Sequence, residues 1–338
     1  MPATQPPSQP SAQAQITFPG SSRSCAPLGV GTWAWGDMST WGMGGYDTNL
    51  TEQTISEAFD ASMEAGVTLF DTAEVYGGGE SERIIGGLLA ADPERAARAI
   101  IATKFMPSPW KLQVTSALLG ALRASLDRLG VASVDLYQIH RWDYETPIAE
   151  TMEALHDVVK AGKARYIGAS AMWAWQFQKA LFTADKHGWT RFVSMQNHLN
   201  LIYREEEREM LPLCRDQQIG VIPYSPLASG RLTRDWSSEQ TLRSESDQIA
   251  KRKYDATAEN DRQVVERVAE IAETHAVPRV HIALAWLLQK HPVTAPIIGA
   301  TKITHLEDAI GALSVTLTQE EVTYLEQPYV PHPIVGHQ

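Results

Sequence analysis

Four polar residues with complementary chemistry each stand at or just past the end of a short apolar run. Asp71 and Tyr76 belong to LFDTAEVYGGGESE, Lys104 closes IIATKF, and His140 closes LYQIH. An ammonium group beside a phenol favours the phenolate and lowers the phenol pKa from its ordinary value of about 10. A carboxylate keeps that ammonium charged, and an imidazole can orient a carbonyl oxygen. The set predicts general acid catalysis on a carbonyl group, with Tyr76 as the proton donor.

Each of these residues also has a structural interpretation when it is taken alone. Lys104 can form a structural ion pair, Asp71 can cap a helix, Tyr76 can pack a loop, and His140 can be a hydrogen-bonded core histidine. Their joint placement favours catalysis, because burying any one of these polar side chains alone is costly. A lyase or aldolase barrel that uses Lys104 as a Schiff base is a further alternative, and it would need no nicotinamide.

The elements that must position these residues follow an alternating pattern. From Leu28 onward, short apolar runs alternate about eight times with amphipathic stretches, which is typical of repeated βα units. We expect strands at Gly29–Trp33, Thr68–Thr72, Ile100–Phe105, Asp135–His140, Tyr166–Ser170, Val193–Gln196, Val221–Tyr224 and Ala295–Ile298. We expect helices at Glu52–Ala65, Thr115–Leu129, Ile148–Lys160, Phe177–Lys186, Glu206–Arg215, Gln263–His275 and His305–Leu313.

This pattern predicts a fold of the α/β class, a single (β/α)8 TIM barrel over residues 21–338. Residues 1–20 are rich in Pro, Gln and Ser, and we expect a disordered lead-in there. The stretches 37–50 and 228–260 are too long for ordinary connectors. We expect them to be long loops over the C-terminal face of the barrel, where active sites of this fold lie.

Composition excludes several classes of function. The net charge of −11 and the lack of a Lys/Arg run argue against nucleic acid as a partner. Two distant cysteines form neither a disulfide framework nor a metal motif, so we expect no metal. The chain has no apolar run long enough for a bilayer, so we expect no membrane partner and a cytoplasmic protein, monomeric or homo-oligomeric.

The motifs together resemble the aldo-keto reductase superfamily. The resemblance extends from Leu28 to Gln327 and rests on DTAEVYGGGESE, IIATKF, LYQIH, QNHLNLIYR, PYSPLASGRLT and IIGATKITHLEDAI. It implies a reductase of small aldehydes or ketones that binds NADP(H) across the carboxyl-end face of its barrel. In that family, residues matching Asp71, Tyr76, Lys104 and His140 form the catalytic tetrad. Consistently, no strand here leads into the G-x-G-x-x-G pattern of other dinucleotide sites.

The resemblance also implies a set of NADPH contacts. Ser170 and Gln196 match positions that hold the nicotinamide carboxamide, and Tyr224 matches the aromatic residue that stacks on the nicotinamide ring. The residues that match the loop along the pyrophosphate are Ser225, Leu227, Gly230 and Arg231. Those that match the region of the adenosine phosphate and adenine are Gly299, Thr301, Lys302, His305 and Asp308. Further expected contacts, at the end of the first predicted strand, are Gly31, Thr32 and Trp33. A cation at Lys302 would favour NADPH by pairing with the 2′-phosphate.

Two positions depart from the family pattern, and the subgroup is mixed. Ala171 stands where Asn commonly follows the serine of the fifth strand, and Ala309 stands where Asn commonly contacts adenine. Both leave the preference for NADPH over NADH open. The early motifs GTWAWG and KFMPSPW resemble a different subgroup from the later YREEEREMLPLC, so the two halves can derive from different subgroups.

Several tryptophans follow the predicted strands. We expect Trp33, Trp110 and Trp142 to line a substrate pocket, with packing at the barrel rim as the alternative. An indole-lined pocket favours aromatic or aliphatic aldehydes over highly charged substrates. Another function stays open because the family resemblance extends to potassium-channel β-subunits: a regulatory barrel that binds NADPH as a redox sensor.

Overall fold

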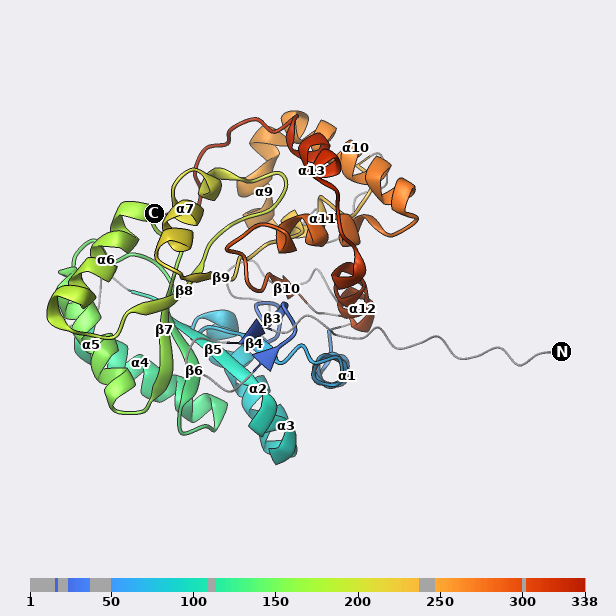
Figure 1. Cartoon of the computed structure of the whole chain (residues 1–338). Coiled ribbons are helices and arrows are strands. Elements are labelled where there is room, and N and C mark those ends of the chain that lie inside the picture. Colours follow the sequence, from blue (N-terminus) through green and yellow to red (C-terminus); the bar gives the residue numbers. More distant parts are fainter. Residues whose placement is uncertain are drawn as a thin grey trace.

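The strands of the barrel form one curled sheet. The computed structural model of the chain describes residues 16–17, 24–36, 50–107, 114–236, 247–299 and 302–337. Its eight-stranded sheet is parallel, in the order β10-β3-β4-β5-β6-β7-β8-β9 (Figure 1). The bounds are β3 Gly29–Gly31, β4 Leu69–Asp71, β5 Ile100–Phe105, β6 Val134–Ile139, β7 Ala164–Ser170, β8 Phe192–Gln196, β9 Gly220–Val221 and β10 Ile297–Gly299.

Contacts between the first and last members of this order close the sheet. Tyr224, which follows β9, forms a parallel bridge with Ile297 of β10. The backbone N–H of Ile297 also donates to the Pro223 carbonyl at 2.8 Å. The predicted (β/α)8 barrel is therefore confirmed. The ladder of β9 ends at Val221, three residues earlier than predicted, because the chain beyond it joins its neighbours only through isolated bridges.

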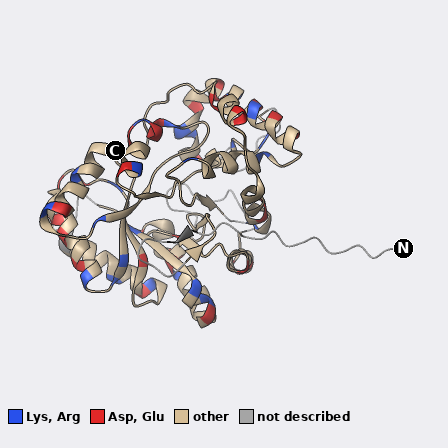
Figure 2. Ribbon diagram, in the orientation of Figure 1, with Lys and Arg blue, Asp and Glu red and all other residues tan. Residues whose placement is uncertain are grey.

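Helices surround the sheet (Figure 1). Their bounds are α1 Glu52–Glu64, α2 Glu80–Ala91, α3 Pro93–Arg98, α4 Val114–Leu129, α5 Ile148–Lys160, α6 Ala174–His187, α7 Met210–Asp216, α9 Gln248–Tyr254, α10 Ala258–His275, α11 Arg279–Leu288, α12 Ile303–Gly311 and α13 Gln319–Glu326. Charged residues gather mostly on these helices, while the central strands are largely uncharged (Figure 2).

The periodicity did not predict α2, α3, α9, α11 or α13. For α11 the weak signal has a physical reason. In α11, every residue from Ile282 to Leu287 is buried, so the helix has no polar face to alternate with. In the stretch 228–260, which we expected to be a loop, α9 occupies Gln248–Tyr254 and α10 begins at Ala258. Asp247 starts α9 by accepting a hydrogen bond from the Ala250 N–H, which is an ordinary N-cap.

The barrel interior changes from apolar to polar along the strands. A small inner cluster at the amino-terminal end contains Cys25, Leu69, Ile100, Ala102, Leu136, Ile222, Ala295 and Ile297. Because side chains alternate along a strand, the next inward positions on β4, β5 and β6 are Asp71, Lys104 and Gln138. The outward positions join a separate, larger core against the helices. The polar end of the interior is thus the carboxyl end of the strands.

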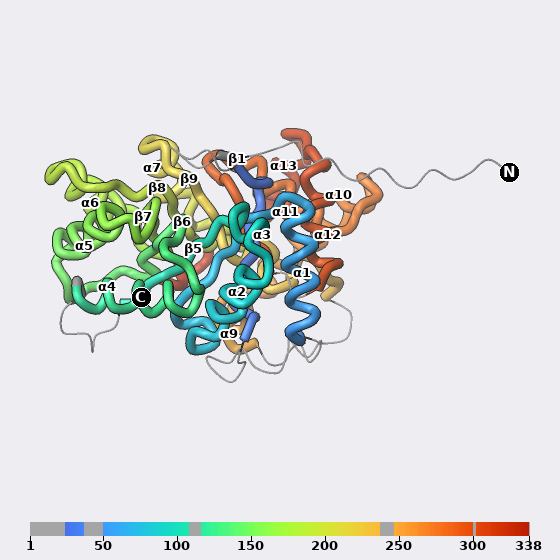
Figure 3. Tube along the Cα trace, turned by 90° about the horizontal axis from the view of Figure 1, so that it is seen from below, coloured from blue at the N-terminus to red at the C-terminus, as the bar shows by residue number. Residues whose placement is uncertain are grey.

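A short hairpin lies at the opposite end of the barrel. Strands β1 (Ile16–Thr17) and β2 (Ser24–Cys25) pair antiparallel. Figure 3 shows β1 at one end of the barrel, with α9 and the carboxyl terminus at the other. Ile16 and Thr17 belong to the lead-in that we expected to be disordered; for its remaining residues, which lie outside the described ranges, disorder stays a prediction. No helix in the described part of the chain is both long enough and apolar enough to cross a membrane.

Two neighbouring glycines of α2 test how tightly this helix packs. A Cβ atom at Gly86 would lie 2.4 Å from the Arg128 carbonyl oxygen at the end of α4, whereas one at Gly87 would meet nothing within 4 Å. We expect Gly86→Ala to lower the free energy of unfolding by about 1–3 kcal/mol. Gly87→Ala should raise it by up to about 1 kcal/mol, because alanine is the better helix former. Urea unfolding of both variants measures this, and equal effects would contradict the packing.

Candidate active site

Asp71, Lys104 and His140 meet at the polar end of the barrel interior. Asp71 ends β4, Lys104 is the last but one residue of β5, and His140 follows β6. The His140 N–H donates to the Phe105 carbonyl at 2.8 Å, which continues the strand register. Lys104 is 0 % and Asp71 2 % exposed, so both groups are shielded from water. Their proximity agrees with the placement predicted from the strand ends.

The Lys104 ammonium group links three oxygen atoms. It forms an ion pair with Asp71, donates to the Thr72 carbonyl at 2.9 Å, and donates to the Tyr76 hydroxyl at 3.2 Å. The ring of His140 lies edge-on to that of Tyr76, with 5.9 Å between the centroids. The structure therefore brings all four predicted residues together around one phenol.

Burial and charge set the protonation of this group. Burial raises the pKa of Tyr76, and the nearby Lys104 lowers it only in part. Burial lowers the pKa of Lys104, but the Asp71 carboxylate and Tyr76 outweigh that effect and raise it. Burial, Lys104 and Arg141 all lower the pKa of His140, well below its usual value. At neutral pH the site thus holds a phenol, an ammonium and a neutral imidazole. The expected acidification by Lys104 acts in the predicted direction, yet burial exceeds it.

A glycine turn places Tyr76. Residues Tyr76–Gly79 form a 3₁₀ turn between β4 and α2, and Gly77, Gly78 and Gly79 have φ values of 54°, 64° and 94°. Three successive residues in the left-handed region are a conformation that glycine adopts without steric cost. We interpret the run as a geometric requirement of the turn that carries the phenol.

Two glutamine amides complete the hydrogen bonding of Asp71. Gln138 and Gln196 donate to Asp71 Oδ2 at 3.2 and 2.9 Å. Gln138 was not among the site residues predicted from the sequence. Its signal was a polar residue two positions before His140, on the inward face of a buried strand. Gln196, expected at the nicotinamide carboxamide, here uses its Nε2 to hold the carboxylate.

Residues at the end of β3 and just after it pack against the site. The buried Thr32 hydroxyl donates to the Asp71 carbonyl at 3.1 Å and shares a hydrogen bond of 2.7 Å with Ser81. A cofactor contact through this hydroxyl would therefore need a rearrangement. Gly31 pairs with Gly299 of the neighbouring β10, and half-buried Trp33 lies in the following turn.

Ser170 and Gln196 lie side by side at the ends of β7 and β8. They are register partners, and the N–H of Ala171 donates to the Gln196 carbonyl at 3.0 Å. Ala171 has φ = 40°, a left-handed conformation that asparagine adopts more readily than alanine. This gives a backbone reason for the asparagine common at this position in the resembling family.

The loop after β9 is irregular. Ser225, Ala228 and Ser229 all have positive φ values, from 49° to 56°, and Gly230 has 86°. Leu227 is half-buried against the core. Arg231 is already paired: its guanidinium forms an ion pair with Asp255 and lies over the rings of Trp236 and Tyr254. Its predicted pyrophosphate contact would need at least part of this pairing to open.

Residues after β10 surround the start of α12. Lys302 is its N-cap residue; Lys302 and His305 are exposed, and Asp308 is half-buried. A helix N-terminus attracts anions, so the side chains of Lys302 and His305 are well placed for a phosphate group. Thr301 and Trp110 lie outside the described residues.

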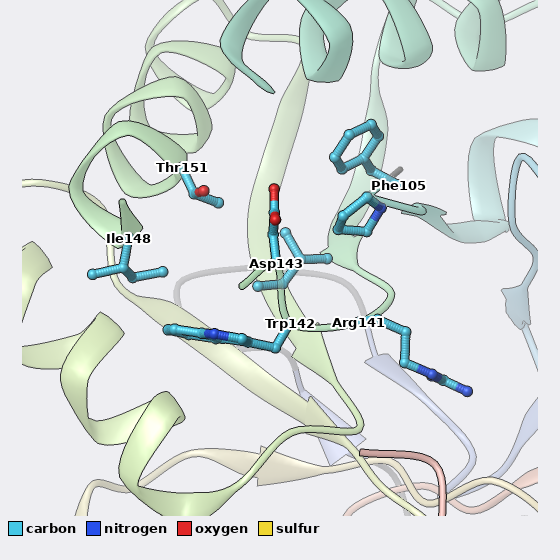
Figure 4. Close-up of a pocket in the computed structure, with 8 residues that line it drawn as sticks. Phe105, Arg141, Trp142, Asp143, Ile148 and Thr151 are labelled. Atoms are coloured by element: carbon cyan, nitrogen blue, oxygen red, sulfur yellow. The ribbon is translucent and has the colours of Figure 1, made fainter. Parts of the chain in front are cut away.

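Trp142 lines a small cleft beside the site. Phe105, Pro107, Ile139, Arg141, Asp143, Ile148 and Thr151 complete its lining. Figure 4 shows the indole extending toward Ile148 while the Arg141 side chain turns away. Tyr76 and Lys104 are absent from this lining, so the cleft lies beside this pair of residues and does not contain it.

The carboxyl-terminal tail, residues 328–337, reaches the same face. Tyr329 and the backbone N–H of His332 donate to buried Glu205 at 2.6 and 2.9 Å. His337 stacks on Trp173 with 4.8 Å between the rings. A Cβ atom at Gly336 would lie 3.1 Å from the Tyr224 hydroxyl. The tail therefore packs beside the predicted nicotinamide platform, a contact that the sequence analysis did not identify.

Comparisons with known proteins show the family and the fold. A family model described as the Aldo/keto reductase family matches residues 27–329. An aldo-keto reductase of Fusarium vanettenii is 42% identical over 316 residues, which cover 85% of each chain. The versiconal hemiacetal acetate reductase of Aspergillus parasiticus is 40% identical over 308 residues, 84% of this chain and 89% of that protein. The crystal structure of the thermostable aldo-keto reductase Tm1743 with the inhibitor epalrestat has a TM-score of 0.74 at 27% identity, covering 94% and 100% of the two chains.

Proposed function

The chain belongs to the aldo/keto reductase family, and we propose that it reduces small aldehydes or ketones to alcohols with NADPH, with Tyr76 as the general acid. Family membership supports the coarser statement, that the chain is an oxidoreductase acting on carbonyl compounds. The observation that carries the finer proposal is the Lys104 ammonium, which contacts both Asp71 and the Tyr76 hydroxyl.

Each residue around the Tyr76 phenol has a different role in the proposed reaction. When bound, NADPH supplies the hydride that adds to the carbonyl carbon. Tyr76 gives its proton to the carbonyl oxygen, and Lys104 stabilises the phenolate that remains. Asp71 keeps Lys104 protonated. His140, whose pKa is lowered by burial and nearby cations, stays neutral and can donate a hydrogen bond that orients the oxygen.

The described residues fit a polyanionic dinucleotide. Lys302 and His305 are exposed at the start of α12, where a helix terminus favours phosphate. Lys253 of α9 lies with its ammonium 4.7 Å from the centre of the Tyr224 ring. The ammonium groups of Lys302 and Lys253 supply positive charge that a phosphorylated cofactor needs.

The Schiff-base alternative fits less well. A lysine that attacks a carbonyl must be neutral. Lys104 has a raised pKa and is bound to the Asp71 carboxylate. Its chemistry therefore supports a charge that stabilises phenolate.

The Tyr76 assignment can be tested by removing one hydroxyl. We expect Tyr76→Phe to lower kcat about 10²- to 10⁴-fold, the usual contribution of general acid catalysis, with the Kd of NADPH nearly unchanged. NADPH oxidation with a panel of aromatic and aliphatic aldehydes measures kcat. The matched control is Tyr137→Phe, which removes a buried hydroxyl outside the barrel interior, bonded at 3.3 Å to the Leu118 carbonyl.

Two results would contradict the proposal in different ways. Near-normal kcat in Tyr76→Phe would remove Tyr76 from the mechanism. A wild-type chain that binds NADPH but oxidises it with no aldehyde of the panel would favour the redox-sensor alternative.

The lowered pKa of Lys253 leads us to expect that the affinity for NADPH depends on pH. The pKa of Lys253 is lowered to about 8, chiefly by burial and then by the nearby Arg141, while Asp247 opposes the shift. Lys253 is therefore charged below pH 8 and neutral above it, and a polyanion binds better to the charged form. The Kd of NADPH should rise above pH 8, by at most about tenfold per pH unit for one linked proton. Fluorescence titration measures this, with Lys253→Met expected to flatten the profile and Arg252→Met on the same helix to preserve it. Equal profiles for the wild-type and Lys253→Met chains would contradict the assignment.

A further inference from the structure

Three aromatic rings form a parallel stack that ends at the predicted nicotinamide platform. His198 lies between Tyr203 and Tyr224, with centroid distances of 4.0 and 5.3 Å and interplanar angles of 15° and 8°. His198 is 1 % and Tyr203 0 % exposed. Tyr224 is therefore backed by a fully enclosed imidazole.

Hydrogen bonds fix the orientation of this imidazole. Asn200 Oδ1 accepts from the Ile202 N–H at 3.0 Å, which directs its amide nitrogen to the Ser225 carbonyl at 2.9 Å and the Tyr254 hydroxyl at 3.1 Å. Because Tyr254 accepts from this amide, its own proton is available to His198 Nε2, 2.7 Å away. The imidazole and the Tyr254 hydroxyl therefore share this hydrogen bond, and the position of the ring is set from α9 and from the segment that follows β8.

The imidazole is also kept neutral. Burial lowers the pKa of His198 well below its usual value, and Lys253, His332 and His337 lower it further. The groups that face it directly are the rings of Tyr203, Tyr224 and Tyr254 and the amide of Asn200. An uncharged ring can pack flat against another ring without bringing a buried charge beneath it.

The same network holds the backbone beyond Tyr224. Ser225 has φ = 53°, in the left-handed region that is sparsely populated by serine. The amide of Asn200 bonds its carbonyl at 2.9 Å and so supports this conformation. The His198 stack on the Tyr224 ring and the hydrogen bond to the carbonyl of the next residue, Ser225, leave Tyr224 little freedom to tilt.

We propose that His198 is a positioning residue for hydride transfer, which fixes the plane of Tyr224 against which the nicotinamide ring stacks. The proposal rests on the proposed function and deepens it, because it assigns a role to a residue outside the Asp71, Tyr76, Lys104 and His140 group. It requires that His198 acts through its flat ring, and that it affects only the nicotinamide half of the cofactor.

Two substitutions of His198 distinguish the effect of a flat aromatic ring from the effect of side-chain volume. His198→Leu fills the space without an aromatic face, whereas His198→Phe keeps a flat ring and loses the hydrogen bonds to Tyr254 and Asn200. The matched control is His187→Leu, because His187 also stacks on an aromatic ring, that of Trp189 at 4.4 Å, but belongs to the outer helix α6. Circular dichroism and thermal unfolding establish that each variant folds.

Two ligands separate the halves of the cofactor. Binding of NADPH and of adenosine 2′,5′-bisphosphate, which lacks nicotinamide, is measured by calorimetry. We expect His198→Leu to raise the Kd of NADPH by about three- to tenfold, the usual weight of a ring stack, and to leave the Kd of the bisphosphate within about twofold. His198→Phe and His187→Leu should resemble the wild-type chain for both ligands.

Each other outcome overturns the proposal. Equal weakening of both ligands by His198→Leu would show a general structural effect, and no weakening of either would remove His198 from the site. If His198→Phe is as impaired as His198→Leu, the hydrogen bond matters and the stack does not. Should His198→Leu fail to fold, a loss of NADPH affinity in His198→Phe with normal bisphosphate binding would equally contradict the stacking role. A wild-type chain that binds neither ligand would instead refute the proposed function itself.

Discussion

The ion pair of Lys104 and Asp71, enclosed inside the barrel, constrains the hydrogen bonding and the protonation of the residues around it. Removing such ions from water costs several kcal/mol each, and the cost is offset only when both are paired and hydrogen-bonded. Lys104 and Asp71 meet this condition with four partners, which come from the segment after β4, from β6 and from β8: the Thr72 carbonyl, the Tyr76 hydroxyl, and the amides of Gln138 and Gln196. The ion pair can exist only where parallel strands converge at the polar end of the interior.

This pair also determines what its neighbours can do. The Lys104 ammonium lies against the Tyr76 hydroxyl and favours the phenolate. Burial has the opposite effect, because it favours the neutral phenol. The same ammonium helps to keep His140 uncharged. The site therefore offers one transferable proton and one neutral hydrogen-bonding ring. Beyond it, the rings of Tyr224, His198 and Tyr203 extend the ordered region toward the carboxyl-terminal tail.

Sequence reasoning succeeded where local pattern and topology agree. The strand Ile100–Phe105 was predicted with its observed bounds because it is a continuous apolar run, and the four residues at strand ends were grouped because parallel strands converge. Prediction failed where contacts between residues far apart in the sequence determine the structure. The buried helix α11 has no amphipathic stripe, Arg231 is paired with an aspartate 24 positions away, and Glu205 binds a tail more than 120 positions away. No local pattern encodes such partners.

The dependence of the site on its buried ion pair is tested most directly by a double-mutant cycle in urea unfolding. Lys104→Met alone leaves the Asp71 carboxylate buried without its cation, and we expect a loss of about 3–5 kcal/mol. Adding Asp71→Asn removes that charge while keeping an acceptor for the two glutamine amides, so the double variant should be more stable than Lys104→Met alone. Losses that simply add, with the double variant less stable than either single one, would contradict the account.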